Sequence, residues 1–192
     1  MSIESAFTEF PHLSTPRLLL RQIRPTDAQA IFEVFSDQDV MEFDSHPLYS
    51  SITDAEDFIQ KLQIGYEQRQ NLRWGISLVG DDTVIGTCSF HRFGPGFHCV
   101  ETGYDLHRAH WGKGIMIEAM AAVLAFGFSD LECHRIEAVI DNANVRSKSL
   151  VLKLGFTYEG TLRQRYPIGD RFEDENYYAL LKSEWLAKQI QI

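Results

Sequence analysis

The sequence predicts an α/β domain with a mixed sheet. Short apolar segments between turn residues alternate with segments of helical spacing, in the order β-α-α-β-β-β-α-β-α-β-β. The chain has 192 residues, so we expect residues 1–192 to form a single domain. Its 44% hydrophobic and 23% charged residues are typical of a globular protein that buries one sizeable core.

The N-terminal third is predicted to begin with a strand and a helix. The strand is Arg17–Ile23, a short apolar segment that Pro25 ends. Thr26 has Gln29 three residues after it, which is the spacing of a capping box. Apolar residues at helical spacing follow, so a helix is expected to begin at this box.

A second helix is predicted from a second capping box. Thr53 is followed by Glu56 at the same spacing, and apolar residues keep one face as far as Tyr66. The stretch Gln38–Ser51 between the two helices contains a His-Pro pair and is predicted to be a loop.

The middle of the chain is predicted to form three strands. Asp81 and Asp82 favour a hairpin between the first two strands, and a Gly-Pro-Gly turn precedes the third. Gly103 inside the third strand indicates either a bulge or a close approach by another group. The strands are Arg73–Gly80, Thr83–Phe93 and His98–Leu106.

The C-terminal half is predicted to begin with a helix, Ile115–Phe128, which is apolar on nearly every side and should pack on more than one face. A short helix then runs from an N-cap at Asn144 to a Schellman-type stop at Gly155. The remaining predicted elements are the strands His134–Ile140, Phe156–Tyr166 and Glu175–Leu181, a turn at Gly169–Asp170, and a terminal helix from Trp185.

Charge is unevenly distributed along the chain. The net charge is −9, and residues 1–60 contain 11 acids but only three arginines. This sign argues against a nucleic-acid partner, which would require a basic face. The acidic segment is either a solvated surface or a surface that attracts a cationic acceptor.

Other classes of protein find little support. No apolar segment is long enough to cross a membrane, and the opening residues lack the basic and apolar regions of a signal peptide. We therefore expect a cytoplasmic protein without a membrane partner. The three cysteines form no CxxC pair, and the histidines lack metal-ligand spacing, so no metal is expected.

The segment HWGKGIMIEAM, His110–Met120, has the form of an anion site. A glycine-rich turn leads into a helix whose first N–H groups lack internal partners, and Lys113 adds a positive charge. A Walker loop is excluded because His107 stands where its first glycine would be. A Rossmann fingerprint is excluded because Ile117 replaces the required third glycine or alanine.

The chain resembles the GNAT superfamily of N-acetyltransferases over Leu13–Trp185, nearly its full length. The motif AHWGKG, Ala109–Gly114, is similar to the Gln/Arg-x-x-Gly-x-Gly/Ala motif of that family, with Ala109 replacing the usual Gln or Arg. The segments LSTPRLLLRQIRPTDA, ETGYDL, NVRSKSLVLKLGF, YEGTLR and ALLKSEW resemble the RimJ/RimL branch, whose best-known members acetylate the N-termini of ribosomal proteins.

The resemblance implies a single-domain GNAT fold, a mostly antiparallel sheet and acetyl-CoA as co-substrate. The glycine turn would hold the CoA pyrophosphate, and Asn144 would hold the pantetheine arm unless it is only a helix cap. The cofactor-binding residues implied in this way are Leu106, Arg108, Trp111, Gly112, Lys113, Gly114, Ile115, Asn144 and Ser147.

The resemblance also implies the catalytic groups. Glu101 is the candidate base, acting through water, unless it only pairs with a neighbouring strand. A bulge near Leu106 would free a backbone N–H for the carbonyl oxygen. Ser147 is the candidate that handles the thiolate, ahead of Tyr104 and Tyr158.

The implied function is transfer of acetyl from acetyl-CoA to a primary amine. The leading acceptor is a protein or peptide N-terminal α-amine, such as that of a ribosomal protein. A small cationic amine (a polyamine, an amino acid or an aminoglycoside) and a non-catalytic acyl-CoA sensor are the alternatives. Basic residues around both motifs and acids elsewhere predict a basic cofactor end and a separate acidic acceptor end. The oligomeric state is not predicted.

Overall fold

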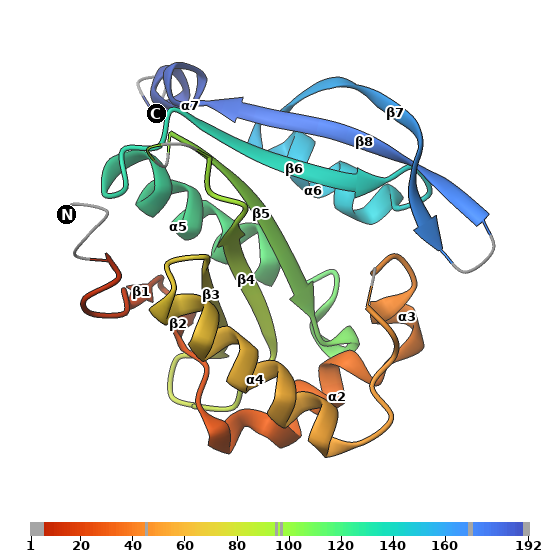
Figure 1. The fold of residues 1–192 in the computed structure, drawn as a ribbon. Helices are drawn as coiled ribbons and strands as arrows, with labels where there is room; N and C mark the ends of the chain where they lie inside the picture. Colours follow the sequence, from red (N-terminus) through yellow and green to blue (C-terminus); the bar gives the residue numbers. More distant parts are fainter. Residues whose placement is uncertain (1–5, 45, 95, 97, 169–170, 190–192) are drawn as a thin grey trace.

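The computed structural model describes residues 6–44, 46–94, 96, 98–168 and 171–189. The described strands form one eight-stranded sheet in the order β1-β2-β3-β4-β5-β6-β8-β7 (Figure 1). Neighbouring strands are antiparallel except β5 and β6, so the sheet is mixed and mostly antiparallel. The strands are β1 (Leu13–Ser14), β2 (Leu18–Gln22), β3 (Asn71–Leu78), β4 (Gly86–His91), β5 (Cys99–Leu106), β6 (Arg135–Asp141), β7 (Thr157–Ile168) and β8 (Arg171–Leu181).

Helices cover both faces of this sheet (Figure 1). Trp74 on β3 packs its ring against Phe126 of α5, while the next residue back, Arg73, lies over Phe58 of α4. Adjacent strand residues point to opposite faces, so α4 and α5 lie on opposite sides of the sheet. The helices are α2 (Ala28–Phe35), α3 (Gln38–Met41), α4 (Ile52–Glu67), α5 (Ile115–Ser129), α6 (Val145–Leu154) and α7 (Lys182–Gln189), with the 3₁₀ turns η1 (Pro25–Asp27) and η3 (Arg108–His110).

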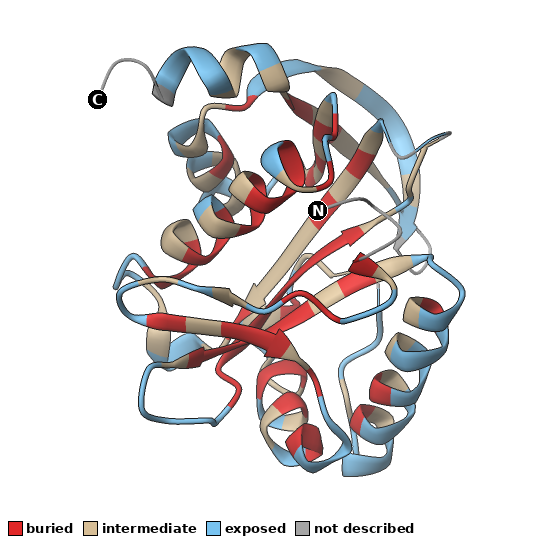
Figure 2. Ribbon diagram, turned by 90° about the vertical axis from the view of Figure 1, so that its left-hand side faces the viewer, coloured by how far each residue is buried: buried red, intermediate tan, exposed pale blue. Residues whose placement is uncertain are grey.

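Helix α5 is buried on most of its surface, as its apolar sequence predicts (Figure 2). Met120, Val123 and Phe128 have no or almost no exposed area. Helices α2 and α4 instead bury one stripe around Ile31 and Ile59 and expose the other side. The all-apolar pattern therefore identified the central helix of the fold.

Both predicted capping boxes are displaced. The first helical segment begins at η1, where Asp27, and not Gln29, accepts from the Arg24 N–H at 2.6 Å. Helix α4 begins two residues earlier than the predicted box at Thr53 implies, with Ser51 and Asp54 forming its box. Several Ser, Thr and acidic residues compete within a few positions at each start, so the motif alone could not choose the register.

The stretch predicted as a loop contains a short helix. Asp37 accepts from the Asp39 N–H at 2.9 Å and caps α3 within Gln38–Ser51. The two-residue strand β1 was not predicted. Helix α7 begins at Lys182, before the expected start at Trp185. The predicted turn Gly169–Asp170 lies outside the described residues, as do Pro95 and Phe97 of the Gly-Pro-Gly turn.

Strands β5 and β6 pair only over a short distance. Their partners are Cys99 with Arg135, Val100 with Ile136 and Glu101 with Glu137. Beyond these residues the two strands diverge (Figure 1). The part of β5 that follows Glu101 therefore has no strand neighbour on its β6 side, and this opening positions the candidate active site.

No bulge occurs in the pairing of β4 with β5, contrary to the expectation for this strand. The register is continuous from Gly86 opposite Leu106 to His91 opposite Glu101. Gly103 is instead a point of close approach, because an added Cβ would lie 3.3 Å from the Ser89 Oγ and 3.4 Å from the His91 ring. The divergence of β6, rather than a bulge, exposes backbone groups of β5.

Candidate active site

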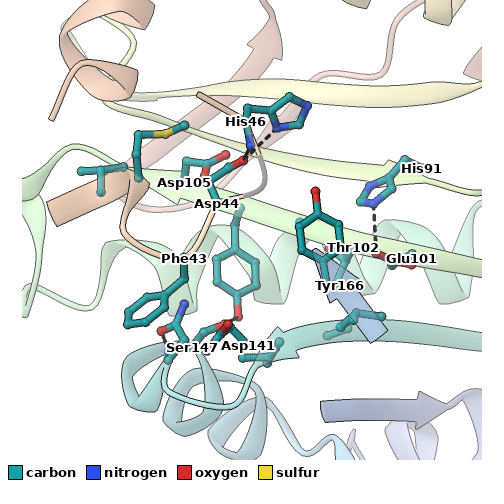
Figure 3. A pocket seen from close by; sticks show the side chains of 18 of the residues that line it. Phe43, Asp44, His46, His91, Glu101, Thr102, Asp105, Asp141, Ser147 and Tyr166 are labelled. Atoms are coloured by element: carbon teal, nitrogen blue, oxygen red, sulfur yellow. Dashed lines mark hydrogen bonds and ion pairs between the residues drawn. The ribbon is translucent and has the colours of Figure 1, made fainter. Parts of the chain in front are cut away.

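Two cavities meet where β5 and β6 diverge. We call them the carboxylate-lined cavity, about 430 Å³, and the glycine-turn cavity, about 650 Å³. Figure 3 shows labelled side chains of the carboxylate-lined cavity, which extends from Glu101 to Ser147. Both cavities are lined by the same six residues at their junction, which are Val40, Phe43, Tyr104, Asp105, Asn144 and Ser147.

The glycine turn has the backbone that an anion site requires. Gly112 has φ +72° and Gly114 has φ +71°, in the left-handed region that favours glycine. Gly114 is the N-cap of α5 and supplies no side chain to the first helical N–H groups. An added Cβ on Gly112 would meet no atom within 4 Å. The turn therefore leaves room and unpaired donors for a phosphate.

Most predicted cofactor residues line the glycine-turn cavity. Arg146 and Lys153 line it as well and supply positive charge. Arg108 and Lys113 do not line it: Arg108 pairs with Asp39, and the Lys113 carbonyl accepts from Arg17 at 3.0 Å. The predicted residues that line it are Leu106, Trp111, Gly112, Gly114, Ile115, Asn144 and Ser147.

The backbone of Leu106 faces the opening between the strands. The His107 N–H donates to the Ile85 carbonyl at 2.8 Å, which fixes the alternation of the β4–β5 ladder. The Leu106 N–H consequently points away from β4, to the side that β6 has left. The Leu106 carbonyl accepts from the Trp111 indole at 2.7 Å, which holds the turn against the strand.

Ser147 and Tyr104 form a hydroxyl pair at the junction of the cavities. Their oxygens are 2.6 Å apart. The Asn144 side chain caps α6 by accepting from the Ser147 N–H at 3.0 Å, so it fixes the serine. Burial raises the pKa of Tyr104 far above its ordinary value, so the phenol keeps its proton near neutral pH. Tyr158, the other tyrosine considered, is half exposed and lines neither cavity.

Glu101 lines the carboxylate-lined cavity but is already paired. Its two oxygens contact the His91 Nε2 at 3.2 Å and the Arg92 Nη1 at 2.9 Å. Burial favours a higher pKa for Glu101, but the hydrogen bonds and charges of His91 and Arg92 prevail and lower it. Glu101 is therefore ionised at neutral pH.

A second polar group in this cavity was missed from the sequence. Asp105 accepts from the Arg73 Nη1 at 3.0 Å and from the Thr87 hydroxyl at 3.1 Å. Burial raises the pKa of Asp105 despite these partners. Two signals were present: Asp105 shares a strand face with Glu101, and Arg73 is a charge inside an apolar strand.

The carboxylate-lined cavity is acidic. Among the described residues it is lined by six carboxylates and two arginines, together with His46 and His91. The carboxylates belong to Asp44, Glu101, Asp105, Asp141, Glu173 and Glu175. A cation is therefore favoured over an anion in this cavity.

The predicted separation into a basic end and an acidic end is wrong in one respect. Asp39 and Glu42, from α3 and its C-cap, lie beside the glycine-turn cavity and pair with Arg108 and Arg146, the latter pair at 3.3 Å. Arg146 also lies 4.3 Å from the ring centre of Trp111. The folded chain thus brings acids and arginines together that the sequence keeps far apart.

The described part of the chain contains neither a membrane-spanning helix nor a cluster of metal-binding side chains. No helix there is long and apolar enough to cross a membrane. No group of three or more His, Cys, Asp or Glu side chains among those residues could hold a metal ion.

Comparison with known proteins identifies the family. A sequence model described as an acetyltransferase (GNAT) domain matches residues 17–157, more than half of the chain. The chain belongs to the GNAT acetyltransferase family. It is therefore an acetyl-CoA-dependent N-acetyltransferase, and the alternative of a non-catalytic sensor does not hold.

Relatives of this GNAT acetyltransferase agree with that assignment. An uncharacterised N-acetyltransferase of Bacillus subtilis, YoaA, is 38% identical over 90% of this chain and 98% of its own. The ribosomal protein uS5-alanine N-acetyltransferase of Escherichia coli is 26% identical over 90% of this chain and 92% of its own. A crystal structure of a GNAT acetyltransferase from Bacillus anthracis superposes with a TM-score of 0.81 at 29% identity, covering 91% and 100% of the two chains.

Proposed function

We propose that this enzyme acetylates the N-terminal α-amine of a protein or peptide, with acetyl-CoA in the glycine-turn cavity and the acceptor in the carboxylate-lined cavity.

 The acceptors include peptides with basic first residues, because the acceptor cavity is acidic. The observation that carries the proposal is the junction of the two cavities at Tyr104 and Ser147, beside the free edge of β5. A thioester in one cavity and an amine in the other would meet there.

The glycine-turn cavity fits the cofactor. Its two left-handed glycines let the backbone approach a pyrophosphate, and Arg146 and Lys153 supply charge for phosphate groups. The cavity then continues past Leu106 and Asn144 toward the junction, which is the path a pantetheine arm would take. Acetyl-CoA supplies the acetyl group as a thioester, which a neutral amine attacks.

Residues at the junction have separate roles in this proposal. Glu101 accepts the proton that the attacking amine loses, and it acts through water because it lies about 10 Å along the strand from Tyr104. The Leu106 N–H stabilises the negative charge on the carbonyl oxygen. Ser147 gives a proton to the departing sulfur when the carbon–sulfur bond breaks, and Tyr104, hydrogen-bonded to it, can replace that proton.

Two observations favour an α-amine as acceptor. An α-amine has a pKa of about 7.7–8.0, so a useful fraction is neutral near pH 7.5 without a strong base, whereas a lysine amine at about 10.4 needs more help. Glu101 is ionised, its pKa is lowered, and in this proposal it acts through water, so it is a weak base. A weak base is sufficient for an α-amine but not for a lysine amine. The relative that acetylates the alanine of ribosomal protein uS5 makes a ribosomal N-terminus a reasonable member of the class.

The second candidate acceptor is a small cationic amine such as a polyamine. The six carboxylates of the acceptor cavity favour it, because each could pair with an ammonium group.

An acceptor panel separates the two candidates by release of free CoA thiol. The panel contains a short peptide with a free α-amine, the same peptide with that amine blocked, and spermidine. We expect thiol release with the free peptide alone; release with spermidine and neither peptide would establish the second candidate.

Replacing Glu101 with glutamine is expected to lower kcat/KM about tenfold, less than loss of a direct base, because the α-amine is already partly neutral. The pKa of Glu101 is held below its ordinary value, so the acidic limb of the pH profile reports the acceptor amine. The loss in kcat/KM should be largest at acidic pH, because most of the acceptor amine is protonated there and most needs a base. Glu137→Gln is the control, since Glu137 pairs with Glu101 in the sheet but bonds Arg135. A profile that Glu101→Gln leaves unchanged would remove Glu101 from the base role.

Neutralising Asp39 and Glu42 together is expected to tighten acetyl-CoA binding about threefold to tenfold at low salt, because Arg108 and Arg146 would be released toward the phosphates. The gain should shrink at high salt, since these pairs are exposed. Glu56→Gln with Asp57→Asn makes the same charge change on exposed residues of α4 and is the control. Unchanged affinity, or an equal gain in the control, would contradict this effect.

We propose that the acetyltransferase domain spans the whole chain and that the enzyme works in the cytoplasm, where its three free cysteines would stay reduced.

A further inference from the structure

Arg17 joins the start of the chain to the glycine turn. Its Nη1 donates to the Lys113 carbonyl at 3.0 Å, and its Nε donates to a Glu118 carboxylate oxygen at 2.5 Å. The Thr15 hydroxyl donates to the other Glu118 oxygen at 2.5 Å. These contacts link residues about a hundred positions apart in the sequence, and none of the roles proposed above uses Arg17.

We propose that Arg17, held by Glu118, is a positioning residue for the cofactor: it fixes the peptide unit between Lys113 and Gly114 so that the Gly114 N–H faces the pyrophosphate. The inference rests on the proposed placement of acetyl-CoA in the glycine-turn cavity. It concerns an interaction behind the turn, because Gly114 lines that cavity and Arg17 does not.

The geometry of the peptide bond carries the inference. The Lys113 carbonyl and the Gly114 N–H belong to one planar trans unit, so they point in opposite directions. A guanidinium that holds the carbonyl on the outer side of the turn therefore directs the N–H to the inner side. Glycines at 112 and 114 give this segment little conformational resistance of its own, so without Arg17 the unit could rotate and present an oxygen to the anion.

Glu118 also depends on its ion pair with Arg17. It lies in the first turn of α5, where a free carboxylate would repel a bound pyrophosphate. Desolvation favours a higher pKa for Glu118, but hydrogen bonds from Thr15 and Arg17 prevail and lower it, so it is ionised at neutral pH. The charge of Arg17 offsets that of Glu118, and Glu118 in turn keeps Arg17 beside the turn.

The test compares two acetyl donors, acetyl-CoA and S-acetylpantetheine, of which the second lacks the pyrophosphate. For Arg17→Ala we expect about tenfold weaker acetyl-CoA binding by calorimetry, with kcat at saturating acetyl-CoA and KM for S-acetylpantetheine unchanged. Arg17→Lys should recover only part of the affinity, because an ammonium group lacks the planar fork that holds both partners. Arg24→Ala is the control, because it removes another half-exposed arginine, one that forms an ion pair with Asp82.

The outcomes are distinguishable. Unchanged acetyl-CoA affinity in Arg17→Ala, or equal losses with both donors, would overturn the positioning role. Gly114→Val separates this failure from a failure of the cofactor placement. If Gly114→Val weakens acetyl-CoA and Arg17→Ala does not, only the positioning role fails; if neither does, the cofactor is not held at this turn. Arg17 is half exposed, so thermal unfolding of Arg17→Ala should stay near that of the parent.

Discussion

Replacing Gly114 with valine is expected to weaken acetyl-CoA binding about a hundredfold, which is about 2.7 kcal/mol. Gly114 has φ +71°, a conformation that a β-branched residue adopts only under strain. An added Cβ would lie 3.5 Å from the Arg17 Nη2, an ordinary contact, so the loss arises from the backbone and from the approach of the pyrophosphate. Calorimetry with acetyl-CoA measures the effect.

Gly80→Val is the matched control for this substitution. Gly80 has φ +88° and an added Cβ there would meet no atom within 4 Å, but it lies in the turn between β3 and β4. The control should lose similar stability in thermal unfolding while keeping its acetyl-CoA affinity. A folded Gly114→Val protein that binds acetyl-CoA as well as the control does would refute the anion site at this turn.

Replacing Ser147 with alanine is expected to lower kcat about a hundredfold with little change in the KM for acetyl-CoA, which is the size of effect typical of proton transfer. The substitution removes the hydroxyl 2.6 Å from Tyr104 and leaves the Asn144 cap, which binds the backbone N–H, in place. Steady-state kinetics with saturating acceptor measures kcat separately from KM.

Ser147→Thr and Ser149→Ala make this result specific. Threonine keeps a hydroxyl and should recover much of the turnover, whereas Ser149 is an exposed serine of the same helix that also lines the glycine-turn cavity. Near-normal kcat in Ser147→Ala, or the same loss in Ser149→Ala, would show that the serine does not handle the leaving thiolate.

The element order of the fold could be predicted from the sequence because periodicity depends on local residues. The apolar run of α5 and the pattern of α6 were sufficient for this. The starts of α2 and α4 could not be fixed, since Ser51 and Thr53 are both good caps and only packing chooses between them.

The candidate site was predictable in part for the same reason. Glycine spacing is a local signal, so the glycine turn could be proposed from the residues themselves, whereas Ser147 was proposed only through the resemblance to the GNAT family. The Asp105–Arg73 pair depends on the register of three strands, and Glu42–Arg146 joins residues 104 positions apart. Such pairs follow from the folded arrangement of the chain and leave no signal in spacing.

The most direct test is the affinity of a conjugate in which an acetyl bridge joins the sulfur of CoA to the α-nitrogen of a short peptide. Its two halves should occupy the two cavities at once, with the bridge at Tyr104 and Ser147. By calorimetry we expect this conjugate to bind at least about tenfold more tightly than CoA or the peptide alone. A conjugate that binds no more tightly than CoA would contradict the arrangement of cofactor and acceptor proposed for this enzyme.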